Sequence, residues 1–394
     1  MKFRFLCSGE SHGKSLNAII EGLPANCPVN EDEINEALTK RQSGYGRGER
    51  MQIESDTVEI KSGIRFGLTT GAPVCLEIKN KDYENWAAAM DVRTPDLSDS
   101  KLAEIIASKK ITKVRPGHAD LAGALKYNQT DIRNILERSS ARETAVKTAV
   151  GAIAKQILKN FNIEIFSNVV SIGGVETVDK NLSYGEKKGL CSSNDLRCAD
   201  KAVYEKMKAR IDEAKSKGVT LGGKVEVVIM NLPVGLGSFV HHDRKLDGLL
   251  AQAVMSIQAV KSVEIGLGVK SAEIDGAKMH DEIYYDGKVE RSSNNAGGIE
   301  GGMSNGEPVV LTFAMKPIPT MQTPLNSIDL DDKSAHQAHF ERSDTCAVPA
   351  CGIVAEAMCA CVLLNAFLEK FGGDSLEELT ANYNSYIEMI AKRL

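Results

Sequence analysis

Hydrophobic and polar positions along the chain follow two periods, one typical of strands and one typical of helices. Short or alternating apolar runs predict strands, and apolar positions three or four residues apart predict amphipathic helices. Because the two kinds of element alternate, the pattern indicates an α+β or α/β fold, and periodicity alone does not choose between them. The predicted strands are residues 3–7, 57–60, 74–79, 163–172 and 224–231, and the predicted helices are residues 31–41, 101–110, 139–160, 201–217, 245–260, 349–370 and 375–392.

Three of these segments differ in the environment that we expect for them. Residues 201–217 are rich in charge, which predicts a solvated helix face. Residues 178–200 are polar, so we expect them to form an insertion with little packed core. The helix over residues 245–260 has an apolar stripe suited to burial, formed by Leu246, Leu249, Leu250, Ala253, Val254 and Ile257.

Composition narrows the class of protein. The chain has 394 residues, which on length alone suggests two or three domains, or one unusually large one. Its net charge of −5 offers no support for a nucleic-acid or membrane surface, and no uninterrupted apolar run approaches the roughly 20 residues of a membrane span. Nine cysteines without a CxxC pair and the absence of a signal-peptide pattern indicate free thiols in a reducing compartment, so we expect a cytoplasmic protein.

The segment over residues 8–15, Ser-Gly-Glu-Ser-His-Gly-Lys-Ser, follows the first predicted strand and combines His12 with glycines, hydroxyls and Lys14. Glycine-rich loops after strands bind phosphate through backbone N–H groups, and histidine moves protons near neutral pH. A nucleotide-hydrolase loop would need glycine at position 8, where the chain has Ser8. A nucleotide hydrolase therefore stays an alternative with an imperfect motif.

A second histidine, His118, lies in the turn over residues 115–120, Arg-Pro-Gly-His-Ala-Asp. Asp120 is close enough in sequence to orient the imidazole. A surface turn with an incidental histidine is the alternative, because turns commonly contain these residue types.

Residues 138–144, Arg-Ser-Ser-Ala-Arg-Glu-Thr, stand where the long helix over residues 139–160 is predicted to begin. Ser140 and Glu143 have the spacing of a capping box. Arg138 beside free helix N–H groups makes this helix start a candidate anion site, although an ordinary cap needs no ligand.

Further candidates lie in glycine-rich or polar loops. Arg41, Arg47 and Arg50 surround a Gly-x-Gly-x-Gly segment at residues 44–48, which predicts a loop that orders on an oxyanion. Residues 294–302 contain four glycines, which imply close backbone approach, but they do not form a dinucleotide fingerprint. Asp344 is a candidate general base or a turn residue. The histidine groups 241–243 and 336–339 offer too few evident ligands, so we expect no metal.

Taken together, these segments resemble the chorismate synthase family. Eight motifs occur in order along nearly the whole chain: residues 9–13, 44–48, 115–120, 138–144, 255–261, 296–302, 316–320 and 342–350. The resemblance implies conversion of 5-enolpyruvylshikimate 3-phosphate to chorismate by 1,4-anti elimination of phosphate, with reduced FMN required. It also implies an α+β fold, a single-domain β-α-β sandwich over residues 1–394, assembled as a homotetramer.

The resemblance further implies roles for individual residues. His12 lies near the substrate phosphate, His118 gives the flavin a proton, and Asp344 relays the proton from flavin N5. Ser11 and Ser139 steady the polar network, and Arg41 and Arg47 contact NADP or substrate. We add Arg115 as an anion contact. The implied FMN contacts are Arg138, Ser139, Ser140, Gln258, Ala259, Gly301, Lys316, Pro317, Ile318, Pro319, Thr320 and Arg342.

The source of the reduced flavin is not fixed by the sequence. NADPH is the candidate reductant, and because we recognise no flavin-reductase domain, we expect a separate reductase to supply the flavin. A non-catalytic protein that binds flavin or phosphate is the third hypothesis. Anaerobic assay with reduced FMN and the enolpyruvyl substrate separates it from the lyase.

Overall fold

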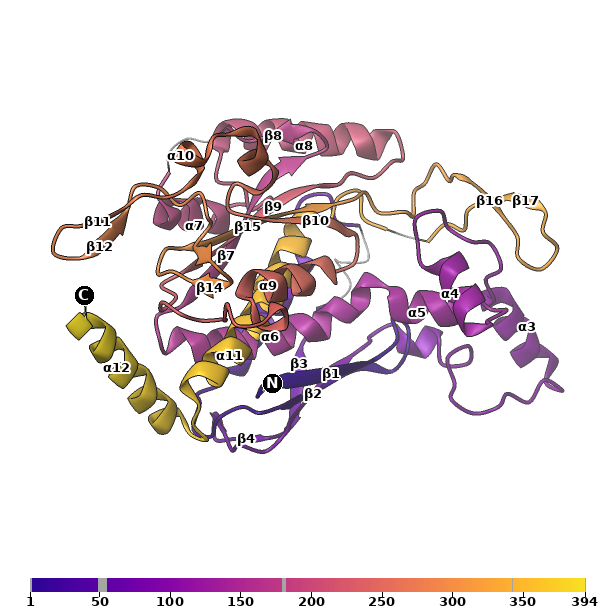
Figure 1. Ribbon diagram of the computed structural model, residues 1–394. Helices are drawn as coiled ribbons and strands as arrows, with labels where there is room; N and C mark the ends of the chain where they lie inside the picture. The colour runs from indigo at the N-terminus through magenta and orange to yellow at the C-terminus, as the bar shows by residue number, and fades with distance from the viewer. Residues whose placement is uncertain (1, 49–54, 179–181, 342, 394) are drawn as a thin grey trace.

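The computed structural model describes residues 2–48, 55–178, 182–341 and 343–393, and within them two antiparallel sheets enclose a layer of helices (Figure 1). The first sheet has the order β1-β2-β6-β3. Its inner face comes from alternation, because Leu16, Ala18 and Ile20 are buried on β2 while Ile19 is half exposed. The strands are β1 (Arg4–Gly9), β2 (Ser15–Glu21), β6 (Val74–Lys79) and β3 (Val58–Ser62).

The second sheet has the order β10-β15-β9-β7-β8, again with antiparallel neighbours. Its central strand β9 is almost continuously apolar, and Val225, Val227 and Ile229 are fully buried. The strands are β10 (Val260–Ile265), β15 (Val309–Met315), β9 (Gly223–Met230), β7 (Glu164–Ile172) and β8 (Val175–Glu176).

Three helices fill the space between the sheets: α1 (Glu31–Gln42), α6 (Thr144–Lys159) and α11 (Val348–Phe371). α6 packs against β2 and β6, and α11 packs against β7, β9 and α6. Gly151 permits this close approach, since a Cβ there would lie 2.3 Å from the Cβ of Ala357. The arrangement confirms the predicted α+β fold and the β-α-β layering.

A smaller lobe extends from one side of the sandwich and carries part of the candidate site (Figure 1). Helix α5 and residues 110–114, which follow α3, meet the β16–β17 hairpin there. Ile111, Val114, Ile132 and Leu136 form a separate small core that Leu330 covers. Its elements are α3 (Ser100–Lys109), α4 (Asp120–Tyr127), α5 (Arg133–Ser139), β16 (Asn326–Ile328) and β17 (Ala335–Gln337).

The remaining elements connect these layers or cover them. The helices are η1 (Tyr83–Asn85), η2 (Ala141–Glu143), α7 (Tyr184–Ser192), α8 (Lys201–Ser216), η3 (His242–Arg244), α9 (Leu246–Met255), η4 (Gly268–Glu273), α10 (Gly276–Met279) and α12 (Leu376–Arg393). The short strands are β4 (Ile64–Arg65), β5 (Leu68–Thr69), β11 (Ile283–Tyr285), β12 (Val289–Arg291), β13 (Ile299–Glu300) and β14 (Met303–Ser304).

Two predicted helices have different bounds in the structure. The helix expected over residues 139–160 is interrupted, because Ser140 has extended backbone angles (φ −58°, ψ 141°) and separates α5 from η2 and α6. The helix expected over residues 245–260 ends at Met255, because a turn leads into β10, with Ala259 in the left-handed region (φ 69°).

The polar segment 178–200 is packed more closely than expected in its second half. Cys191, Leu196 and Cys198 are almost fully buried, and the last two belong to the main core. The expectation of little packed core is therefore wrong for residues 191–200.

α11 is long and apolar enough to cross a membrane by length and composition alone. Glu356 interrupts its apolar run, in agreement with the expectation of no uninterrupted apolar run of spanning length. In the structure most of its hydrophobic window is buried, and the helix packs against β7 and β9 of the second sheet and against α6, as expected for the central helix of a sandwich.

Candidate active site

His12 lies in the hairpin turn between β1 and β2. Gly9 starts the turn with φ 106°, and a side chain there would clash with the carbonyl oxygen of Ser15 at 2.3 Å. The Asn80 amide donates to the carbonyls of Glu10 (3.1 Å) and Gly13 (2.6 Å). A nucleotide-hydrolase loop leads from a strand into a helix. Because this loop leads into an antiparallel strand, the nucleotide-hydrolase alternative is wrong.

A buried carboxylate holds the His12 ring. Glu137 of α5 accepts from Nδ1 of His12 at 2.9 and 3.0 Å and from its backbone N–H at 2.7 Å. The ring stacks on Trp86 with 4.0 Å between centroids. Arg133 donates to Glu137 (3.2 Å), so the carboxylate is balanced by a guanidinium.

Segment 138–144 connects the His12 hairpin to the sandwich. Arg138 donates to the carbonyls of Gly9 and Cys7 (both 3.2 Å). Ser140, rather than Ser139, reaches the hairpin, since its hydroxyl donates to Ser11 (3.3 Å) while Ser139 donates to Leu136 within α5 (3.5 Å).

The predicted capping box is wrong in its partners. The Ser140 hydroxyl accepts from the backbone of Arg142 (3.2 Å) instead of from Glu143. The Glu143 carboxylate binds Lys147 (2.7 Å) and Arg138 (3.0 Å). The segment is therefore a polar break between two helices and not the first turn of one long helix.

His118 is held by a second buried carboxylate. Its Nδ1 lies 2.5 Å from Oδ1 of Asp120, which is fully buried. Arg115 donates to both oxygens of Asp120 at 2.8 and 2.9 Å. Burial raises the pKa of Asp120, but hydrogen bonds from Arg115 and His118 outweigh it and hold the pKa well below its usual range. The predicted orienting role of Asp120 is thus present in the geometry.

The loop of residues 316–320 lies beside His118. Arg115 donates to the Thr320 hydroxyl (3.3 Å), and the Lys316 ammonium donates to the carbonyl of Gly117. Pro319 lies against Gly117, and the Ile318 carbonyl accepts from Thr220 (2.6 Å). Pro317 is exposed at the same bend. Arg115 is fully engaged with protein groups, which leaves its predicted role as an anion contact without support.

Glu341 connects the two histidine clusters. Its carboxylate accepts from Arg133 (3.1 Å), which also binds Glu137. Burial raises the pKa of Glu341, yet His339, Arg133 and Arg115 lower it to about 2. A chain of alternating charges therefore runs from the His12 cluster toward the His118 cluster.

Gln258 contributes an unpaired group near segment 138–144. Its amide N–H donates to Glu143 (2.7 Å), while its buried Oε1 has no hydrogen-bond partner in the described part of the chain. Ala259 adopts its left-handed conformation here and accepts from the backbone of Lys316 (2.9 Å). A buried acceptor without a donor, beside cationic Arg138 and Lys316, fits an anionic ligand that also carries hydroxyl or N–H groups, such as FMN.

The arginines expected in one loop have different environments. Arg41 belongs to α1 and is buried, donating to Thr144 (2.8 Å) and to the carbonyl of Ala141 (3.0 Å). It stands near the end of the helix predicted over residues 31–41, outside the glycine-rich segment. Arg47 lies in the glycine-rich segment and pairs with Asp344 at 2.7 Å. Asp344 also accepts from Gly48 (2.7 Å). Arg50 and Arg342 lie outside the described residues.

Gly301, a predicted FMN contact, lies apart from both histidine clusters. It lies in the turn between β13 and β14, beside Phe239, and the neighbouring Gly302 accepts from the first residue of α9, Leu246. No contact among the described residues ties it to the His12 or His118 cluster.

The two groups of histidines, at residues 241–243 and 336–339, differ in how close their ligand atoms lie. His241, His242 and Asp243 bring three ligand atoms within 4.8 Å of one another, but all three residues are exposed. His336 lies in β17 and His339 follows it in an extended segment, so the two do not share a helix face.

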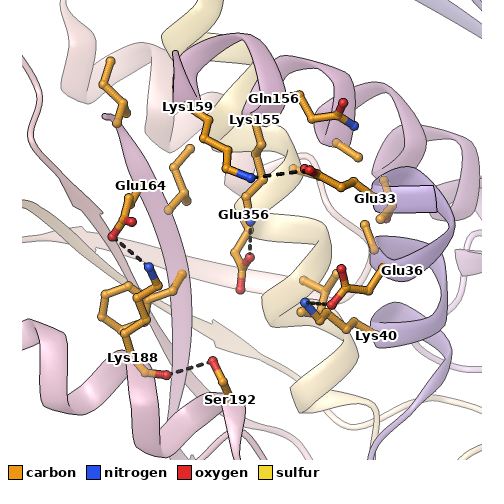
Figure 2. A pocket seen from close by; sticks show the side chains of 18 of the residues that line it. Glu33, Glu36, Lys40, Lys155, Gln156, Lys159, Glu164, Lys188, Ser192 and Glu356 are labelled. Atoms are coloured by element: carbon orange, nitrogen blue, oxygen red, sulfur yellow. Dashed lines mark hydrogen bonds and ion pairs between the residues drawn. The ribbon is translucent and has the colours of Figure 1, made fainter. Parts of the chain in front are cut away.

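A hollow of about 340 Å³ lies between α1, α6, α7, α11 and β7 and contains none of the predicted site residues (Figure 2). Its charges are paired: Lys155 with Glu356 (2.6 Å), Lys159 with Glu33 (3.4 Å) and Lys188 with Glu164 (2.8 Å). Such mutual pairing is typical of structural ion pairs between packed elements.

Comparison with known proteins decides the family. The chorismate synthase family model matches residues 3–368. The chain belongs to the chorismate synthase family. Chorismate synthases of Pelobacter propionicus and Geobacter sulfurreducens are each 52% identical to it over 396 residues, covering 98% of this chain and 99% of the relative. A crystal structure of a chorismate synthase is 42% identical, with a TM-score of 0.79 over 100% of this chain and 99% of that one.

As a member of the chorismate synthase family, the chain is a lyase of aromatic biosynthesis that eliminates phosphate from 5-enolpyruvylshikimate 3-phosphate and depends on reduced FMN. Sequence reasoning missed Glu137, Arg133, Glu341 and Trp86. The one local signal was the i, i+4 spacing of Arg133 and Glu137 on a short helix.

Proposed function

We propose that this chorismate synthase uses His12 and His118 as its two proton-transferring residues, at opposite ends of one charged cluster. The observation that supports this is the buried carboxylate at Nδ1 of each ring, Glu137 for His12 and Asp120 for His118. A carboxylate at one nitrogen fixes the ring, so the other nitrogen is the one that can face the reacting group. In His118 this nitrogen, Nε2, also lies 3.3 Å from the Arg115 guanidinium.

His12 donates to the departing phosphate, and hydrogen-bond donors around the hairpin stabilise the charge that develops on it. Reduced FMN, when bound, supplies an electron to the substrate and takes up a proton at N5. The residues suited to hold it are Arg138 and Ser140, the open acceptor of Gln258, and Lys316 to Thr320. His118 gives the flavin ring a proton, and Asp344 moves the proton away from N5.

We further propose a cytoplasmic homotetramer whose protomer is a single domain over residues 1–394. One buried cluster that runs from Phe3 to Leu379 supports the single domain. Arg41 and Arg47 are proposed to contact NADP or substrate, with NADPH as reductant or a separate reductase as the source of reduced FMN. Mixing FMN, NADPH and purified protein tests the first source, because bleaching of the flavin would show self-supply.

The central test is anaerobic turnover with photoreduced FMN and 5-enolpyruvylshikimate 3-phosphate. We expect equimolar release of phosphate and chorismate, and we expect His12→Ala and His118→Ala each to lower the rate by about 10²–10⁴-fold with the fold intact. Folded protein that binds FMN but releases no phosphate would contradict the lyase. Native rates in both variants would contradict the assignment of the two histidines.

A further inference from the structure

Glu137 contacts His12 in more ways than a buried ion pair requires. Its carboxylate accepts from both the ring Nδ1 and the backbone N–H of His12, and its own carbonyl accepts from the backbone N–H of Ser11 (3.0 Å). Glu137 is 2% exposed and His12 is 5% exposed. Hydrogen bonds to ionised groups in such a dry environment are among the strong ones.

The geometry determines which nitrogen of His12 can act. A carboxylate only accepts hydrogen bonds, so Nδ1 of His12 carries the proton that faces Glu137. One face of the ring is covered by Trp86. Nε2 is therefore the nitrogen left for a ligand, and it becomes a donor only when the ring is an imidazolium.

We propose that Glu137 is the positioning residue of the phosphate-elimination step. It orients His12 with Nε2 toward the departing phosphate and stabilises the imidazolium that donates to it. The inference rests on the proposed function for the step itself, whereas the coupling of Glu137 to His12 stands without it.

The charges around the ring favour this role for Glu137. Arg133 pairs with Glu137, but it is shared with Glu341, so Glu137 keeps part of its charge for His12. Lys109 lies over Trp86 with its ammonium 4.0 Å from the ring centroid. Its positive charge disfavours the imidazolium form of His12, which the negative charge of Glu137 favours. The charged groups facing His12 and Trp86 are Glu137 and Arg133 of α5, Lys109 of α3 and Glu341 of the segment after β17.

The variant Glu137→Gln removes the negative charge of the side chain while nearly keeping its shape. The glutamine oxygen in the place of Oε2 still accepts from Nδ1 and from the backbone of His12, which keeps the orientation of the ring. The amide nitrogen replaces Oε1, so the negative charge and the hydrogen bond from Arg133 are lost together. We expect kcat to fall by about 10²-fold near pH 8 with little change in KM, since only the donating form is disfavoured. The loss is smaller at pH 6, where bulk protons restore the imidazolium. A purely structural role would lower the rate equally at both pH values.

Trp86 makes the coupling measurable without substrate or flavin. It is the only tryptophan in the chain, and its ring lies 4.0 Å from the ring of His12. An imidazolium quenches indole fluorescence more strongly than a neutral imidazole, so a pH titration of Trp86 emission reports the charge on His12. His12→Ala should abolish this transition. In Glu137→Gln we expect the transition to move to lower pH, because an opposite charge in contact has been removed.

The outcomes separate the inference from the proposed function. An unmoved midpoint in Glu137→Gln would overturn the coupling. If the midpoint moves but turnover falls equally at pH 6 and pH 8, the proposal that Glu137 positions His12 for catalysis is overturned. If native protein shows no elimination, the proposed function fails while the fluorescence result still decides the coupling. Glu137→Asp should restore the midpoint in part, and Glu213→Gln on exposed α8 is the matched control with native behaviour.

Discussion

Glu356 is a buried carboxylate in the middle of the central helix α11, and its replacement by glutamine is a sharp test of how the sandwich is held together. It accepts from Ser167 of β7 (2.7 Å) and from Arg197 of the segment after α7 (2.7 Å). It also accepts from Lys155 of α6 (2.6 Å), as Figure 2 shows. One side chain therefore links three layers of the fold.

The magnitude follows from the pKa of Glu356. Burial raises it, but Lys155 and Arg197 outweigh burial and hold it at about 2, against 4.5 for a free glutamate. Because the folded pKa lies below the unfolded one, the ionised pair stabilises the fold by about 3 kcal/mol above pH 4.5. That contribution is lost as the pH falls toward 2. Removing one partner of a buried pair typically costs about 3–5 kcal/mol. Lys155 is one-third exposed and can be rehydrated, so we expect the lower end.

The assay is thermal unfolding of the native protein and Glu356→Gln at pH 7 and pH 3, followed by circular dichroism. With about 2.1 cal/mol/K of unfolding entropy per residue over 394 residues, the loss lowers Tm by about 4 °C at pH 7. At pH 3 the difference should be less than half as large. Glu213→Gln, whose pair with Lys217 is exposed, should change Tm little. Equal Tm values at pH 7, or a gap that does not narrow in acid, would refute the reasoning.

Three further predictions concern the site and the core. Asp120→Asn should lower kcat by about 10²-fold, because Arg115 and His118 lose their shared carboxylate. An unchanged rate in a stopped-flow phosphate assay would show that the His118 ring is held by other means. Gly151→Ala should destabilise the fold by about 1–3 kcal/mol in urea titrations despite the better helix propensity of alanine, because the added Cβ meets backbone atoms of Ala357. Gln258→Leu should raise the Kd for FMN about tenfold, since it removes an acceptor that lacks a protein donor, and it should also lower Tm, because Glu143 loses the amide donor of Gln258; native FMN affinity would speak against a contact there.

The parts of the fold that the sequence predicted are those with local signals. β6 was predicted over residues 74–79, which it occupies, because its buried and exposed positions alternate, and α11 followed from its long apolar run. The break at Ser140 has no comparable signal, since good helix formers stand on both sides of it. The end of α9 was missed for a similar reason. Alanine at the left-handed position 259 gives no warning of a turn.

In the site, too, the pairings that the sequence predicted are those with a local signal. The turn over residues 115–120 contains both His118 and Asp120, so its pairing was visible in the sequence. Glu137 stands 125 residues from His12, and Glu341 stands 208 residues from Arg133. Such pairs are set by tertiary packing, and a single sequence contains no pattern that joins them.

One histidine is paired within a turn and the other by tertiary packing, so the two are held differently in the structure. Asp120 begins α4 two residues after His118, so that pair is fixed by one turn and by Arg115 beside it. The His12 pair exists only where α5 docks on the β1–β2 hairpin, because Glu137 comes from the lobe with its own small core. The ion pair of Arg133 with Glu341 joins α5 to the segment that follows β17. A movement of the lobe would therefore release the charge partner of His12 while leaving His118 paired, so the donor to the departing phosphate is complete only in the docked arrangement.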